Sequence, residues 1–226
     1  MTVLSVRNLR KQQGWNQQEL ARRVGVSQTL VSLWEHGERQ IPTGRLRQLH
    51  QLGMELNPVE LPMPNKVSAT EVDYAQELSN LGYPGFAHFH SGEPMWNPAE
   101  LLVHALSEKN LERRVAEALS WLVLRYSEMD WVWVQREAKL HNLQNRVGFT
   151  LVLARKLAVQ KQEGEVAARL AMQEESLRES RLAKEDTYCY ESMTQAERKW
   201  LQTRRSPEAF AWNVLSDLEP VYLTHV

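Results

Sequence analysis

The chain has 226 residues, of which 42% are hydrophobic and 24% are charged, with a formal net charge of −1 at pH 7. These values are typical of a soluble globular protein, and the absence of any run near the roughly 18 apolar residues of a membrane span excludes a transmembrane chain. One cysteine, Cys189, excludes an internal disulfide framework. With no apolar signal peptide at the N-terminus, we expect a cytoplasmic protein.

The charge is divided unevenly along the chain. Residues 1–57 hold eight Lys and Arg against four Asp and Glu, which gives +4, whereas residues 58–226 carry −5. A positive potential that attracts phosphate groups is therefore expected in the N-terminal part.

The first elements are two helices separated by a glycine. A helix is expected from Leu4 to Gln13, ending at Gly14. Asn16 is a suitable N-cap for the next helix, and Glu19 has the spacing of a capping box. Gly25 can adopt the left-handed conformation that often ends a helix. The apolar stripe of this second helix is Leu20, Ala21 and Val24.

A further short helix is expected over residues 27–36, with Ser27 as its N-cap. Its buried side would be Leu30, Val31 and Trp34, which leaves Gln28, Thr29, Ser32 and Leu33 facing out. Short uncharged polar side chains hydrogen-bond base edges and do not repel phosphates, so this face suits the DNA major groove. The alternative is an ordinary helical hairpin with a polar outer face. Pro42 then opens a helix that reaches about Met54.

Residues 4–57 resemble the Xre/Cro-repressor family of helix-turn-helix domains. The matching residues are Leu9-Arg10, Gln17, Glu19-Leu20-Ala21, Gly25-Val26-Ser27, Trp34-Glu35, Gly37 and Pro42. The resemblance implies a five-helix, lambda-repressor-like domain that binds operator DNA as a dimer. It also implies an internal pair between Arg10 and Glu35.

The resemblance implies base contacts from one side of the 27–36 helix, namely Ser27, Gln28, Thr29, Ser32 and Leu33. We expect phosphate contacts from Gln17, Asn16, His36, Arg39, Arg45 and Arg47. Leu33 is apolar where many family members have a polar or basic residue, so it either touches a thymine methyl group or packs.

Residues 58–96 are expected to link two domains. Pro58, Pro62 and Pro64 favour an extended linker. A short helix over 71–81 and an irregular Gly-, Pro- and His-containing segment over 82–94 would follow.

Residues 97–226 show mostly helical patterns and predict a larger helical-bundle domain, which makes the fold class all-α. Helices are expected from 97, over 110–126, 129–140, 147–159 and 162–185, after Thr194, and from Ser206 through Leu218. The 147–159 helix would be buried on more than one side, although 149–153 alone could be a strand.

We find no residue set for an enzyme, a metal or a cofactor. His88 and His90 are the only close histidine pair, and no second pair accompanies them. Cys189 would need a histidine partner to serve as a catalytic thiol, and a buried structural cysteine is the commoner case.

The aromatic residues Trp121, Trp131 and Trp133 are candidates for a partner surface or a pocket. Trp131 and Trp133 are two apart, so they diverge on a helix. Either one of them lines a groove or an interface, or both are buried between packed helices.

The sequence therefore predicts a DNA-binding transcriptional regulator, a repressor acting as a homodimer on double-stranded operator DNA. One alternative is an antitoxin or defence-operon regulator whose acidic C-terminal domain binds a basic toxin or effector protein. Another is a regulator that senses a small ligand in a tryptophan-lined pocket.

Overall fold

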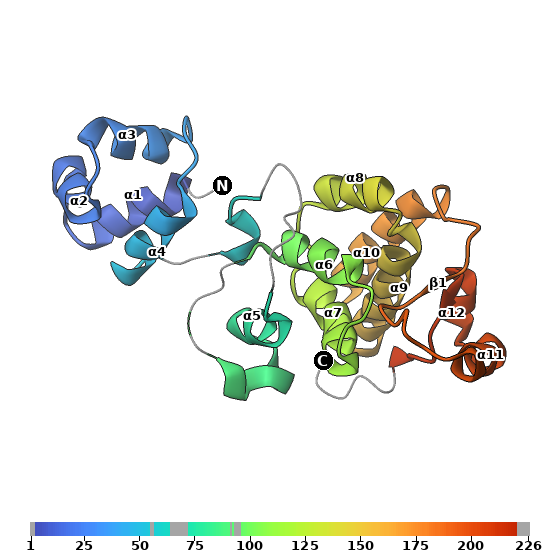
Figure 1. The fold of residues 1–226 in the computed structure, drawn as a ribbon. Coiled ribbons are helices and arrows are strands. Elements are labelled where there is room, and N and C mark those ends of the chain that lie inside the picture. The colour runs from blue at the N-terminus through green and yellow to red at the C-terminus, as the bar shows by residue number, and fades with distance from the viewer. Residues whose placement is uncertain (1–2, 55–56, 64–71, 91, 93–95, 221–226) are drawn as a thin grey trace. The chain divides into compact units, whose positions relative to one another are not determined.

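The structure is a computed structural model that describes residues 3–54, 57–63, 72–90, 92 and 96–220. The chain divides into two compact units, residues 1–63 and 64–226. Helices make up most of both units (Figure 1), and the described residues contain one two-stranded sheet. The predicted all-α fold class is confirmed.

The first unit is built from short helices. They are α1 (Val3–Gln12), α2 (Gln17–Val24), α3 (Gln28–His36), α4 (Thr43–Gln51) and the 3-10 turn η1 (Pro58–Glu60). Within the described residues of this unit, η1 stands in place of a fifth α-helix. The expected helices at 4–13, 17–24 and 27–36 are confirmed to within two residues.

Local sequence signals set the ends of α2 and α3. Asn16 Oδ1 accepts a hydrogen bond from the Glu19 amide at 2.8 Å, and Ser27 Oγ accepts one from the Leu30 amide at 3.2 Å. Gly25 follows α2 with a φ of 70°, which a residue without a Cβ adopts at little cost. The Glu19 carboxylate contacts Arg22 instead of completing the expected capping box.

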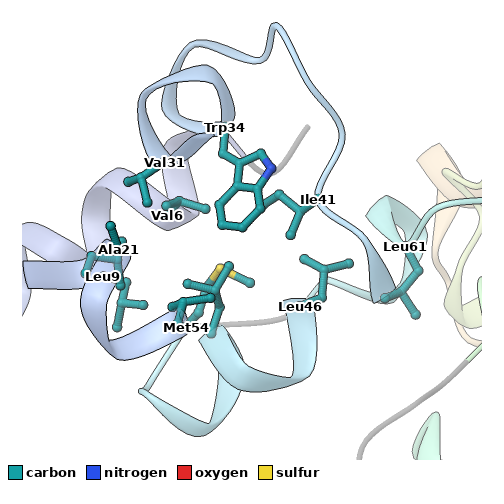
Figure 2. Close-up of a cluster of buried hydrophobic side chains, with 12 residues drawn as sticks. Val6, Leu9, Ala21, Val31, Trp34, Ile41, Leu46, Met54 and Leu61 are labelled. Atoms are coloured by element: carbon teal, nitrogen blue, oxygen red, sulfur yellow. The ribbon is translucent and has the colours of Figure 1, made fainter. Parts of the chain in front are cut away.

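An apolar core holds these helices together. Figure 2 shows the Trp34 indole at the centre of the cluster, with Val6 and Ile41 on either side. Leu61 also belongs to this cluster. The first unit therefore extends beyond residue 57, where the linker was expected to begin, and Pro64 lies outside the described residues.

The second unit contains eight further α-helices among its described residues, together with the 3-10 segment η2 (Pro84–Phe89). The helices are α5 (Tyr74–Asn80), α6 (Pro98–Ser107), α7 (Arg113–Arg125), α8 (Trp131–His141), α9 (Gln144–Gln160), α10 (Gly164–Arg178), α11 (Gln195–Arg204) and α12 (Pro207–Ala211). The central helix is α9, which packs against α7 and α10. Its residues 144–154 are all buried, so the prediction of burial on several sides is confirmed and the strand alternative for 149–153 is wrong.

Several predicted helix ends in this unit are wrong. The last helix stops at Ala211 instead of reaching Leu218, because Asn213 adopts a φ of 54° and Val214–Leu215 form strand β2. This strand pairs in parallel with β1, Asp186–Thr187. The exposed helix predicted over 162–185 ends at Arg178.

The start predicted for α7 is also wrong. The helix begins at Arg113 and not at Asn110, which pairs antiparallel with Tyr190. In addition, Asn110 Oδ1 accepts a hydrogen bond from the Ser192 amide at 2.9 Å. Contacts with residues some 80 positions away thus override the local helical pattern.

A buried arginine anchors the C-terminal segment to α9. Arg146 donates to both carboxylate oxygens of Asp186, at 2.9 and 3.0 Å, and to the carbonyl oxygens of Leu106 and Glu108. Four acceptors on one desolvated guanidinium fix the positions of α6, α9 and β1 together.

Candidate nucleic-acid interface

The helix α3 presents two different sides. Val31 and Trp34 are buried in the core of the first unit, whereas Gln28 and Thr29 are exposed at the N-terminal end of the helix. Ser32 and Leu33 are half-buried. Of the five residues expected to contact bases, Gln28 and Thr29 are thus the most accessible side chains on α3 itself.

Ser27 is exposed and also has a structural role. Its hydroxyl caps α3 by accepting the Leu30 amide hydrogen, as described above. At the end of the helix, His36 Nδ1 lies 2.7 Å from the carbonyl oxygen of Ser32, one turn earlier. This contact directs the exposed His36 ring along the outer side of α3.

A charged network fixes α1, α2 and α3 to one another. Arg10 forms two hydrogen bonds with the Glu35 carboxylate, Nε to Oε1 at 2.6 Å and Nη2 to Oε2 at 3.2 Å. Gln17 Nε2 also donates to Glu35 Oε2, at 2.9 Å. The structure thus contains the Arg10–Glu35 pair and adds Gln17, an expected phosphate contact, to it.

The pKa of Glu35 reflects this network. Burial alone would raise the pKa of this carboxyl group, because the side chain is only 3% exposed. Hydrogen bonds from Arg10 and Gln17, together with the positive charges of Arg10 and Arg7, outweigh burial and hold the pKa below its ordinary value. Glu35 is therefore ionised at neutral pH.

The expected phosphate contacts lie in different environments. Arg39 is exposed in the loop after α3, and Asn16 is exposed at the start of α2. Arg45 is half-buried and donates to the carbonyl oxygen of Val24 and to Gln48 Oε1. The side chain of Arg47 lies outside the described part of the structure.

An open hollow joins the N-terminal ends of α2 and α3. Its volume is about 500 Å³, and its lining includes Asn16, Gln18, Arg22 and Gln28. Gln18 and Arg22, which were not among the expected DNA contacts, are exposed side chains of α2 in this lining. The hollow brings Asn16, expected to contact a phosphate, and Gln28, expected to contact a base, into one lining.

The tryptophan candidates in the second unit are buried. Trp121, Trp131 and Trp133 are each 7% exposed, so both members of the Trp131/Trp133 pair pack inside. Trp131 Nε1 donates to the Ser127 carbonyl oxygen at 2.9 Å. The interpretation that one of these indoles lines a surface groove is wrong; the alternative of burial between helices holds.

The other chemical candidates of the second unit are also placed. Cys189 is buried, and burial raises the pKa of its thiol to about 12, so it is protonated at neutral pH. His88 and His90 are exposed, and among the described residues no group of three or more His, Cys, Asp or Glu could hold a metal ion.

A comparison with known families assigns the first unit. Residues 6–52 match the family model described as Helix-turn-helix. The first unit contains a helix-turn-helix domain. No curated protein and no solved structure matches the chain, and the second unit has no assigned family.

The helix-turn-helix domain supports a DNA-binding regulator that acts on double-stranded DNA. The matched family is regulatory and not enzymatic. In the part of the chain that the structure describes, the helices are too short or too polar to cross a lipid bilayer.

Proposed function

We propose that this protein is a transcriptional repressor that reads operator DNA with the exposed side of α3. The observation that carries the proposal is the exposure of Gln28 and Thr29 at the N-terminal end of α3, while Val31 and Trp34 hold the opposite side in the core. In helix-turn-helix proteins, it is the N-terminal residues of the second helix that reach base edges in the major groove.

The side chains suggest a division of roles. Gln28 carries both an amide donor and an acceptor and suits the two hydrogen-bonding positions of adenine in the major groove. Thr29, Ser32 and Leu33 would add polar and methyl contacts. Ser27, Asn16 and Gln17 belong to helix ends whose geometry they fix, so their contribution to DNA binding would be partly positional.

Phosphate contacts would come from residues around α3. Arg39 in the loop and His36 at the end of the helix are both exposed. We assign Arg45 a double role, since it already holds the carbonyl oxygen of Val24 at the end of α2. Arg47 is retained from the sequence as a further phosphate contact.

Two copies are expected to act together. A helix of nine residues such as α3 reads only a few base pairs, and a dimer places two such helices roughly 34 Å apart on successive turns of DNA. The proposed operator is therefore a pair of related half-sites.

An antitoxin role is the second candidate. The net charge of −5 on residues 58–226 would complement a basic toxin or effector protein. Copurification of a small basic protein from the native host would support it. The buried positions of Trp121, Trp131 and Trp133 remove the observation that suggested a small-ligand sensor.

The first prediction tests base reading by Gln28. DNA bound by the full chain is selected from a random library, and Gln28→Ala is then compared with the wild type on the selected sequence and on single-base variants. Loss of a bidentate base contact should cost about 1–3 kcal/mol of discrimination at one position.

The control for this experiment is Gln51→Ala, which removes an exposed glutamine at the end of α4. We expect it to bind as the wild type does. Unchanged base preference in Gln28→Ala would show that α3 does not read DNA through this residue.

A further inference from the structure

The contacts of the His36 ring determine which of its two nitrogen atoms carries the hydrogen. His36 is the last residue of α3 and is exposed. Its Nδ1 lies 2.7 Å from the carbonyl oxygen of Ser32 and 3.5 Å from the hydroxyl oxygen of the same residue. The carbonyl contact is the shorter one, and a carbonyl oxygen only accepts hydrogen bonds. Nδ1 is therefore the protonated nitrogen and donates to Ser32.

The second ring nitrogen, Nε2, is left for other contacts. The hydrogen bonds of His36 within the described structure both involve Nδ1. A neutral imidazole has a single N–H, so Nε2 of the neutral ring is an acceptor. A phosphate oxygen is an acceptor too, and the neutral ring cannot hydrogen-bond it through Nε2. The positively charged ring carries a hydrogen on both nitrogens and can donate from Nε2 to a phosphate.

The charged groups around α3 leave the charge of the His36 ring to an outside partner. The helices α1 and α2 pack against α3. The preceding residue, Glu35, is turned into the first unit, where Arg10 binds its carboxylate. The other charged side chains of α1, α2 and the loop after α3 are exposed or bonded to one another, namely Arg7, Lys11, Glu19, Arg22, Arg23, Glu38 and Arg39. Among the described residues, no carboxylate forms an ion pair with His36.

We propose that binding of operator DNA takes up a proton at His36. The inference rests on the proposed function, in which the end of α3 approaches the DNA backbone, and it adds the ionisation state that this contact requires. The hydrogen bond to Ser32 exists in both states of the ring. Protonation thus changes Nε2 from an acceptor into a charged donor while α3 stays in place.

A dependence of DNA binding on pH follows from this requirement. Histidine is the side chain that ordinarily changes its charge between pH 5 and 8. Because the complex holds more protons than the free protein and DNA, affinity should rise as pH falls through this range. Arg39 provides the contrast, since a guanidinium keeps its charge at every pH in the range and its phosphate contact would not titrate.

The first measurement tests the position of the hydrogen without DNA. Long-range proton–nitrogen NMR spectra of the full chain, labelled with ¹⁵N in its seven histidines, distinguish the two neutral forms of each ring. The spectrum of His36→Gln identifies the signals of His36. At a pH where histidines are neutral, we expect the form with the hydrogen on Nδ1. The form with the hydrogen on Nε2 would overturn the inference, because the neutral ring could then bind a phosphate.

The second measurement follows the affinity for the selected DNA at constant salt over roughly pH 6 to 8.5. The Glu35 carboxylate stays ionised over this range, because its pKa lies below the ordinary value of a glutamic acid. Wild-type affinity should rise on acidification by up to about tenfold per pH unit for each His36 in the complex. His36→Gln should flatten the rise, because glutamine does not titrate. His36→Lys should bind tightly at every pH tested.

The matched control is His141→Gln, which removes an exposed histidine from the last turn of α8 in the second unit. It should keep the wild-type pH profile. Calorimetric titration in two buffers that differ in ionisation enthalpy counts the protons taken up on binding, and the count should fall in His36→Gln only. If His36→Gln and the wild type bind DNA with the same pH profile, the inference is wrong and the proposed function stands. If the wild type binds no DNA at any pH, the proposed function fails and the inference fails with it.

Discussion

Glu35 shows how one buried charge can hold the helix α3 in place. Its carboxylate receives hydrogen bonds from Arg10 of α1 and Gln17 of α2, while its own backbone belongs to α3. A buried carboxylate is stable only when its charge is satisfied in this way. The network therefore couples the orientation of α3 to both other helices.

The prediction at this scale concerns Glu35→Gln. The substitution leaves the Arg10 guanidinium without its carboxylate and should destabilise the first unit by about 2–3 kcal/mol. Hydrogen exchange of α1–α3 peptides in the full chain measures the loss, and Glu38→Gln in the exposed loop is the control.

The same variant has a defined pH dependence. Because the folded-state pKa of Glu35 lies below its unfolded value, the stabilisation is complete above that unfolded value and is lost as pH falls through the folded-state pKa. The gap between wild type and Glu35→Gln should therefore be wide at pH 7 and close in acid. A gap that stays constant into acid would contradict the assigned role.

At the scale of the elements, α9 approaches Trp212, the residue after α12, most closely at Gly148. A Cβ built on Gly148 would lie 2.3 Å from ring atoms of Trp212, the buried residue that follows α12. Real Cβ contacts are never this short, so glycine is required for the packing of Trp212 against α9.

We accordingly expect Gly148→Ala to destabilise the second unit by about 1–3 kcal/mol through overpacking. Gly164→Ala at the start of α10 is the control, because nothing lies within 4 Å of its added Cβ. Denaturant unfolding of the full chain measures both. Equal stabilities for the two variants would show that Trp212 moves aside freely.

The elements that were predicted correctly are those whose signals are local. Asn16, Ser27 and Gly25 determine the ends of α2 and α3 through backbone groups within five residues. The errors occur where contacts between residues far apart in the sequence determine where a helix begins or ends. Asn110 leaves the α7 helix to pair with Tyr190, and Val214 leaves the last helix to pair with Asp186.

The candidate site was predictable to a similar extent. The side of α3 that holds Gln28 and Thr29 follows from helical spacing alone. The engagement of Gln17 with Glu35, and of Arg45 with the end of α2, depends on tertiary packing that spacing does not encode. The same holds for Trp131 and Trp133, because helices on different sides of α8 can bury diverging side chains.

On the scale of the whole molecule, the division of charge separates two kinds of partner. Residues 1–57 carry +4 and residues 58–226 carry −5. The net charge of the chain is near zero because the charge of the basic part, which holds the helix-turn-helix domain, and the charge of the acidic remainder nearly cancel. DNA binding should therefore depend strongly on salt, even though the chain as a whole is not basic.

The last prediction uses this dependence to test a phosphate contact. Arg39→Gln should weaken binding to all sequences alike and reduce the slope of log affinity against log salt by about 1, because one phosphate contact releases about one counterion. Lys199→Gln removes an exposed positive charge from α11 in the acidic unit and should leave the slope unchanged. Binding is measured at several salt concentrations on the selected DNA and on an unrelated duplex. Equal salt slopes for Arg39→Gln and the wild type would show that Arg39 does not contact DNA. Equal losses of affinity in Arg39→Gln and Lys199→Gln would show that binding depends on the total charge of the chain and not on the basic first unit.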